Sequence, residues 1–220
     1  MSNYQTIELA NWPRAEHFKF YQLATHPWFN IIADIDANTL LAYCKEEQLS
    51  FFHAYLYLTQ IAINELAPFK LRIVDNEVRL YEKIKVSCAI LADDETMRFC
   101  GFPYAHSFSE FDEKAHIAQE TAKASPFIAS QFVGGDKAQD EVHMSVIPWV
   151  SFSSFTNARN TAAIDSIPKI VYGKATRTTQ GLMMPLSVEV HHGVMDGLYV
   201  GRFFEKIQQL FDNPETYLID

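Results

Sequence analysis

The segment LSVEVHHGVMDG, residues 186–197, constrains the fold more strongly than any other part of the chain. Its first residues alternate between apolar and polar, which predicts a strand with one face in the core. The strand runs directly into a turn and then a helix. Because neighbouring side chains of a strand point to opposite faces, His191 and His192 are not expected to chelate one metal ion together.

Helical patterns occupy most of the N-terminal part. The first helix is expected to begin near Asn11, with Pro13 in its first turn, and to continue to Leu23. A second helix, capped by Asp36 or Asn38, is expected to reach about Gln48. A third, apolar helix is expected to begin at Leu49 or Ser50 and to end before Pro68. Residues 25–30 are expected to form a loop after the first helix. Residues 109–124 and 196–212 have helical spacing, and Pro214 ends the last helix.

Strand patterns begin after Phe69. Asp75-Asn76 predicts the turn of a hairpin, and a third strand follows it. Residues 143–155 and 182–192 alternate as further strands, and residues 134–136 mark a turn. Because helices and strands follow one another without a regular βαβ repeat, the order favours an α/β fold, a two-layer sandwich with a mixed β-sheet.

Composition excludes several classes of partner. The net charge is −9 and no basic run occurs, which argues against nucleic acid or an anionic membrane surface as a partner. The most apolar stretch, residues 51–66, is too short and too polar to cross a bilayer. Three cysteines without a CxxC motif are typical of a reducing compartment, so a cytoplasmic protein is expected. No repeat or linker divides the chain, which predicts a single domain over residues 1–220.

The histidine at the end of the strand allows two interpretations. A histidine there can act as a general base near neutral pH, with an aspartate four residues later fixing the local geometry. Alternatively, the histidine is a satisfied core residue, and Asp196 before Gly197 is simply a helix N-cap. The other histidines show no tight ligand spacing, so no metal is expected.

HHGVMDG at residues 191–197 resembles the HHxxxDG signature of the chloramphenicol acetyltransferase family. Four other blocks resemble that family in the same order and spacing: NWPRAEHFKFY, KLRIVDNEVRLYE, SVIPWVSFSSF, and the GKATRTTQGLMMPLSVEVHH stretch that leads into the signature. The resemblance covers nearly the whole chain. It implies a CoA-dependent acyltransferase fold and a homotrimer whose active sites lie at the subunit interfaces.

The resemblance also implies roles for individual residues. His192 is expected to be the general base that deprotonates an acceptor hydroxyl as the hydroxyl attacks the thioester of acetyl-CoA, with both substrates bound together and no acyl-enzyme. Asp196 pairs with Arg14 and orients the loop that carries His192. Ser145 donates a hydrogen bond to the tetrahedral oxyanion, an interaction that strengthens as charge develops. No metal is required.

The resemblance places the remaining site residues around these groups. The expected acceptor pocket contains Tyr21 and Phe29, which match the family, and Met97, Asn157 and Val171, which depart from it. Lys174 is expected near the CoA phosphates, and Trp149 and Phe52 along the pantetheine tunnel. Because the departures concern the acceptor side, a different small hydroxylated acceptor remains an alternative to chloramphenicol.

Two further alternatives remain open. One is a non-catalytic trimeric binding protein with the same fold, against which the joint presence of Arg14, Ser145, His192 and Asp196 argues. The other is the acyltransferase core of a ketoacid dehydrogenase complex, which has a related motif. Such chains carry a lipoyl domain and a flexible linker upstream, whereas this chain is expected to begin directly with the catalytic domain.

Overall fold

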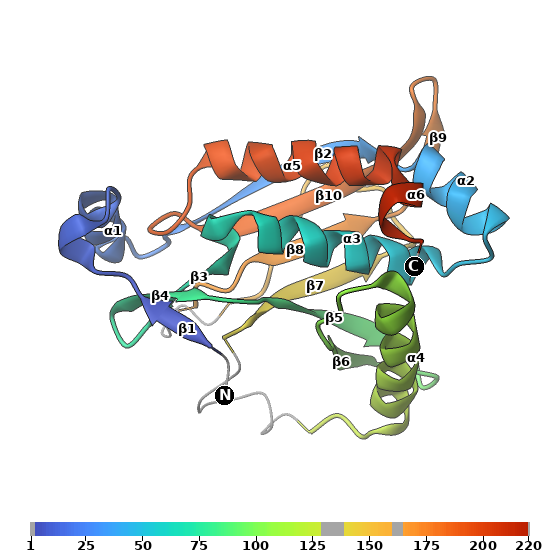
Figure 1. The fold of residues 1–220 in the computed structure, drawn as a ribbon, viewed down its shortest axis with the longest axis horizontal. Coiled ribbons are helices and arrows are strands. Elements are labelled where there is room, and N and C mark those ends of the chain that lie inside the picture. Colours follow the sequence, from blue (N-terminus) through green and yellow to red (C-terminus); the bar gives the residue numbers. More distant parts are fainter. Residues whose placement is uncertain (1–2, 129–138, 160–164, 220) are drawn as a thin grey trace.

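The strand expected at residues 182–192 lies inside a seven-stranded sheet (Figure 1). The chain is described by a computed structural model over residues 3–128, 139–159 and 165–219. The strands of the large sheet are ordered β2-β10-β8-β7-β5-β6, with β9 also paired to β10. Their bounds are β2 Trp28–Asp36, β5 Lys85–Leu91, β6 Met97–Phe102, β7 Glu141–Ile147, β8 Lys169–Gly173, β9 Thr176–Thr178 and β10 Gly181–His191.

The sheet is mixed, as predicted. β7 runs parallel to both β5 and β8, whereas β10 is antiparallel to β2, β8 and β9, and β5 is antiparallel to β6. A second, small sheet has the order β1-β4-β3 and contains the predicted hairpin. Its strands are β1 Tyr4–Thr6, β3 Leu71–Val74 and β4 Glu77–Tyr81.

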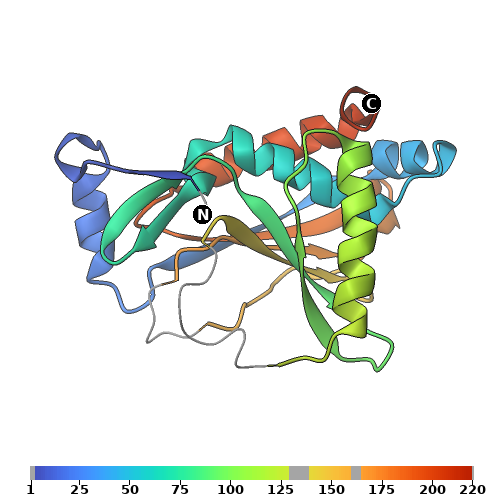
Figure 2. The same ribbon diagram turned by 60° about the horizontal axis from the view of Figure 1, so that its bottom comes forward.

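Helices cover one face of the large sheet (Figure 2). α3 and α5 lie side by side on it, and α4 lies against β5 and β6. The α-helices are α1 Ala15–Gln22, α2 Asn38–Glu46, α3 Phe51–Glu65, α4 Phe108–Ala124, α5 Gly197–Asp212 and α6 Pro214–Tyr217, and two 3-10 helices span Leu9–Asn11 and Ala67–Lys70. The arrangement is the predicted two-layer sandwich.

The alternation in β10 determines which face is buried. Leu186, Val188 and Val190 pack under the helices and are at most 1% exposed. Burial of such side chains contributes about 1.5–3 kcal/mol each. The intervening residues point to the opposite face, which we call the open face. There, register aligns one row across five strands: Ser187, Val171, Ser145, Ala89 and Phe99.

Several local predictions are confirmed. The Ser50 side chain accepts a hydrogen bond from the backbone N–H of His53 and so caps α3. Asp75 and Asn76 have φ angles of 53° and 63°, the left-handed conformation of a tight hairpin turn. α5 ends at Asp212, before Pro214.

The predicted start of the first helix at Asn11 is wrong. Asn11 ends a 3-10 helix, and α1 begins only at Ala15. Pro13 is the physical cause, because the residue before a proline is pushed toward extended backbone. Trp12 indeed has ψ of 121°. Pro13 therefore precedes the helix instead of lying in its first turn.

Two predictions along the large sheet are also wrong. The strand expected at residues 143–155 ends at Ile147, because Pro148 cannot donate to a strand ladder. Residues 25–30 are not entirely a loop, since β2 begins at Trp28 and pairs with β10 through nine residues. The turn expected at residues 134–136 lies outside the described residues.

Among the described residues, no helix is both long and apolar enough to cross a membrane.

Candidate active site

His192 follows the last residue of β10, and its peptide groups are fixed on both sides. Its backbone N–H donates to Pro27 O at 2.7 Å. Its carbonyl accepts a hydrogen bond from Arg14 Nη2 at 2.9 Å. These contacts join the end of a central strand to the segment before β2 and to the residue before α1. The side chain of His192 therefore projects from a rigid backbone.

Two aromatic rings enclose the imidazole of His192. Tyr21 stacks on it with ring centroids 4.2 Å apart and planes 10° apart. Phe29 packs against it at 4.5 Å and 46°. The side chain of His192 is still 31% exposed to solvent. The structure thus brings together the predicted base and two predicted acceptor-pocket residues.

Asp196 occupies the N-cap position of α5 but does not act as a cap. Its carboxylate makes no cap hydrogen bond and instead accepts hydrogen bonds from both terminal nitrogens of Arg14, at 3.0 Å for Nη2 to Oδ1. The hydrogen bond from Arg14 lowers the pKa of Asp196, aided by the charge of Arg14. The carboxylate is therefore ionised at neutral pH.

Asp196 also faces His192. Its Oδ1 lies 3.2 Å from His192 Nδ1, although the two atoms are not aligned as a hydrogen bond. Nδ1 is buried against this anion, whereas the imidazole as a whole stays partly exposed. In the neutral ring, an N–H at Nδ1 faces this anion and leaves the lone pair on Nε2.

His191, the other histidine of the motif, is a buried core residue whose ring is hydrogen-bonded within the turn. It is 5% exposed, and its Nδ1 accepts a hydrogen bond from the Gly193 backbone at 3.1 Å. Burial, with the charge of Arg159, lowers the pKa of His191 to about 4. A β-carbon on Gly193 would lie 2.9 Å from the His191 ring, so the turn leaves no space for a side chain there.

The Arg14 interaction can be tested by substitution. We expect Arg14→Ala to destabilise the fold by about 1–2 kcal/mol, because the pair is only partly buried. In a chain of this size that lowers Tm by roughly 2–4 °C per kcal/mol. Turnover should fall as well, since His192 loses the hydrogen bond to its carbonyl. Thermal unfolding and initial rates measure both effects.

Two variants make this test specific. Asp196→Asn removes the ion pair and the anion beside His192 Nδ1 but leaves Arg14 Nη2 able to hold the His192 carbonyl, so its turnover should fall while the backbone of His192 stays in place. Lys19→Ala breaks the exposed pair with Glu16 on α1 and should change neither quantity. If Arg14→Ala had the Tm and the rate of the wild type, Arg14 would have no role in positioning His192.

The predicted oxyanion donor lies elsewhere on the sheet. Ser145 is in β7, in register with Val171 of β8 and, through it, with Ser187 of β10. His192 is five residues beyond Ser187, or roughly 17 Å along an extended strand. Ser145 and Val171 are thus neighbours on the open face, but within one chain Ser145 does not reach His192.

Met97 and Asn157 also belong to the open face. Met97 is two residues before Phe99 in β6 and is 44% exposed. Asn157 lies in the segment that crosses this face, where the Phe155 carbonyl accepts from Asn30 Nδ2 at 2.9 Å. Among the described residues, the buried Nδ2 of Asn157 has no hydrogen-bond partner.

Two of the three residues predicted for CoA, Lys174 and Trp149, lie toward the end of β10 that is far from His192. Lys174 is exposed, and its backbone N–H donates to the carbonyl of Val150, next to Trp149, which is 63% exposed. Phe52, near the start of α3, packs against Tyr55 and Phe102 under the helical layer.

Two side-chain groups were missed by the sequence prediction. Arg159 donates to Glu189 Oε1 at 2.5 Å and to Asp165 Oδ2 at 2.7 Å, forming a buried ion network on the open face. His53, Asp112 and His116 form a cluster whose ligand atoms could hold a metal ion. The spacing of Asp112 and His116 by four residues was a signal in the sequence, but the position of His53 beside them was not.

Comparison with known proteins gives consistent matches. Residues 2–208 match the family model described as chloramphenicol acetyltransferase. The chain is 29% identical to chloramphenicol acetyltransferase 3 of Escherichia coli, over 94% of this chain and 97% of that relative. It is 30% identical to the Staphylococcus aureus chloramphenicol acetyltransferase, over 99% and 100%.

Solved structures give the same picture. A chloramphenicol acetyltransferase structure superimposes with a TM-score of 0.85 at 27% identity, covering 95% of this chain and 100% of that one. A dihydrolipoamide acetyltransferase of Azotobacter vinelandii has a TM-score of 0.67 at 18% identity, over 92% and 88%. The latter similarity extends to the fold alone.

Proposed function

Because the chain belongs to the chloramphenicol acetyltransferase family, we propose that it transfers the acetyl group of acetyl-CoA to a hydroxyl of chloramphenicol. The observation that carries this proposal is the setting of His192. Its backbone is held on both sides, its ring lies between Tyr21 and Phe29, and the carboxylate of Asp196 lies at its Nδ1.

The proposed chemistry needs one base and one oxyanion donor. Nε2 of His192 takes the hydroxyl proton as the alkoxide oxygen forms a bond to the thioester carbon. The resulting oxyanion accepts a hydrogen bond from Ser145. When the carbon–sulfur bond breaks, the CoA thiolate leaves and takes the proton from Nε2. The Asp196 anion stabilises the imidazolium while it carries both protons.

We propose that two subunits build each site. The register of β7, β8 and β10 keeps Ser145 away from His192 in one chain, and Lys174 is also toward the far end of β10. The open face carries exposed apolar side chains at Leu91, Met97 and Phe99. Docking His192 of one subunit onto the open face of its neighbour would cover these side chains and bring base and donor together, in a homotrimer like that implied by the family resemblance.

Within this arrangement, we assign the acceptor to the open face and CoA to the end of β10 that is far from His192. Tyr21 and Phe29 contact the base, Met97 and Asn157 belong to the neighbour's open face, and Val171, which is 1% exposed, lies beneath that face beside Ser145. Lys174 and Trp149 are exposed where CoA phosphates and pantetheine can reach them, and Phe52 packs between α3 and β6. No step in this chemistry uses a metal.

Asn157 favours a second candidate acceptor. Its buried Nδ2 has no partner among the described residues, and an unsatisfied buried donor costs about 1–3 kcal/mol. An acceptor with an oxygen at this position would satisfy it. Another small hydroxylated molecule that presents an oxygen to this amide is the alternative substrate.

The deciding experiment measures thiol release from acetyl-CoA with and without chloramphenicol. We expect release that depends on the drug and saturates with both substrates. Bound acetyl-CoA without drug-dependent release, but with release on other alcohols, would identify the alternative acceptor. Binding of acetyl-CoA without release on any alcohol tested would contradict catalysis and favour a binding protein.

A further inference from the structure

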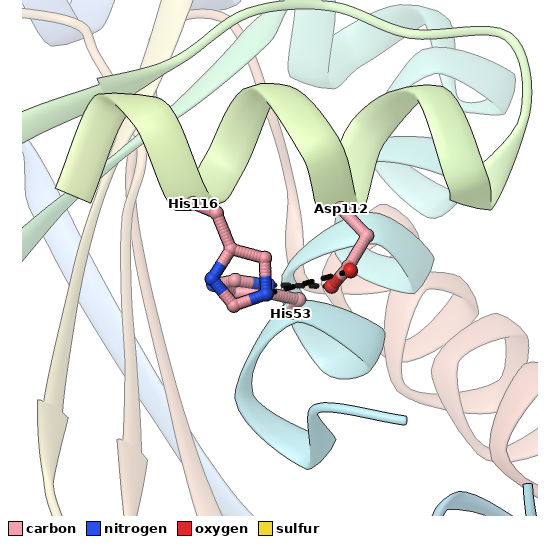
Figure 3. A group of neighbouring side chains, drawn as sticks. All are labelled: His53, Asp112 and His116. Carbon is pink, nitrogen blue, oxygen red and sulfur yellow. Dashed lines mark hydrogen bonds and ion pairs between the residues drawn. The ribbon is translucent and has the colours of Figure 1, made fainter. Parts of the chain in front are cut away.

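A cluster of three side chains joins two helices of the covering layer (Figure 3). His53 comes from the first turn of α3, and Asp112 and His116 come from successive turns of α4. Residues four apart on a helix share one face, so both α4 side chains point toward His53. None of the three has a part in the proposed acetyl transfer.

His53 is buried between two oxygen atoms. Its side chain is 2% exposed, and both ring nitrogens face oxygen atoms: Nδ1 lies 2.6 Å from Asp112 Oδ1, and Nε2 contacts Gln119 Oε1. A neutral imidazole has only one N–H. If Nε2 donates to Gln119, the lone pair of Nδ1 faces a carboxylate. A metal ion bound to both atoms removes this conflict, once Nδ1 and Oδ1 move from 2.6 Å to the separation of about 3.3 Å between two ligands of one ion.

The arrangement has the parts of a transition-metal site. A histidine that binds a metal through one nitrogen almost always donates its other N–H to an oxygen, and Gln119 provides that oxygen for His53. His116 Nε2 lies 3.5 Å from Asp112 Oδ2, close to the separation of about 3.3 Å between ligands of a tetrahedral zinc ion. One ligand atom from each residue lies within 4.8 Å of the other two.

From this geometry we propose that His53, Asp112 and His116 bind a divalent transition metal of the zinc type. Two imidazoles and one carboxylate are zinc ligands, whereas calcium and magnesium prefer oxygen alone. The His116 side chain is 65% exposed, so it is free to rotate toward the bound ion. A water molecule can serve as the fourth ligand of the ion. The ion then links α3 to α4 above the sheet.

The proposal can be tested on protein without a polyhistidine tag that has been freed of metal by a chelator. Titration with Co²⁺, followed by its visible absorption, should show one saturable site per chain with a four-coordinate spectrum, and Zn²⁺ should displace the cobalt. Zn²⁺ should also raise Tm, because it binds the folded chain.

Variants identify the ligands. Gln119→Leu should weaken binding by about 10–100-fold, as expected for loss of an outer-shell partner, and His116→Ala and Asp112→Asn should weaken it further. His106→Ala removes another exposed histidine, from the loop before α4, and should bind like wild type. Because His116 is exposed, its loss should leave the fold intact, which circular dichroism would verify.

Two results would overturn the proposal. Absence of saturable binding would mean that His53 and Asp112 are joined by a hydrogen bond alone. Equal affinity in wild type and His116→Ala would mean that any bound metal is adventitious.

Discussion

His192→Ala should lower the rate of drug-dependent thiol release by about 10³–10⁴-fold, the upper part of the range for a positioned general base. The acceptor hydroxyl then has no group to take its proton during attack. Binding of acetyl-CoA should change little, because the residues assigned to it lie at the other end of β10. Steady-state rates together with calorimetric binding of CoA separate the two effects.

Two variants control for this result. His192→Gln fills most of the space between Tyr21 and Phe29 without providing a base, so it should be nearly as inactive as the alanine variant. His26→Ala removes a nearby exposed histidine that packs edge-on against Trp28, and it should keep its activity. Substantial turnover by His192→Ala would refute the assignment of the base.

Mixing two inactive variants should restore activity. Ser145→Ala alone should cost about 10²–10³-fold, the usual effect of losing one oxyanion donor. If each site takes His192 from one subunit and Ser145 from the next, a mixed trimer of His192→Ala and Ser145→Ala chains contains one interface with both residues intact. For random assembly of equal amounts in a three-fold ring, about a quarter of the sites are active.

This complementation distinguishes shared sites from sites within one chain. The two variants are denatured, mixed and refolded together, and thiol release is compared with that of each variant refolded alone. A mixture as inactive as its components, with mixed trimers demonstrated by mass spectrometry, would contradict the shared site. The double variant His192→Ala, Ser145→Ala, refolded with either single variant, is the matched control and should remain inactive.

Local rules account for the parts of the fold that were predicted correctly. Alternation identified β10, the Ser50 hydroxyl identified the start of α3, and Asp75-Asn76 identified a hairpin turn because both residues tolerate positive φ. β2 was largely missed because its residues WFNIIADID place apolar side chains on both faces and give no clean alternation.

The site depends on contacts that no local rule contains. Arg14 and Asp196 are 182 residues apart, and their pairing was expected only from family resemblance. His53 and Asp112 are 59 residues apart, and their contact arises from the packing of α3 against α4. The separation of Ser145 from His192 became visible only once the register of three strands was known.

The position of β10 has a consequence for synthesis of the chain. β10 is the last strand made, yet it lies between β2 and β8. Until residue 191 has left the ribosome, both neighbours present unpaired edges, which are templates for association with other chains. During most of its translation, the nascent chain therefore lacks the strand that pairs with β2 and β8. Slow translation or early termination near the C-terminus should yield aggregates.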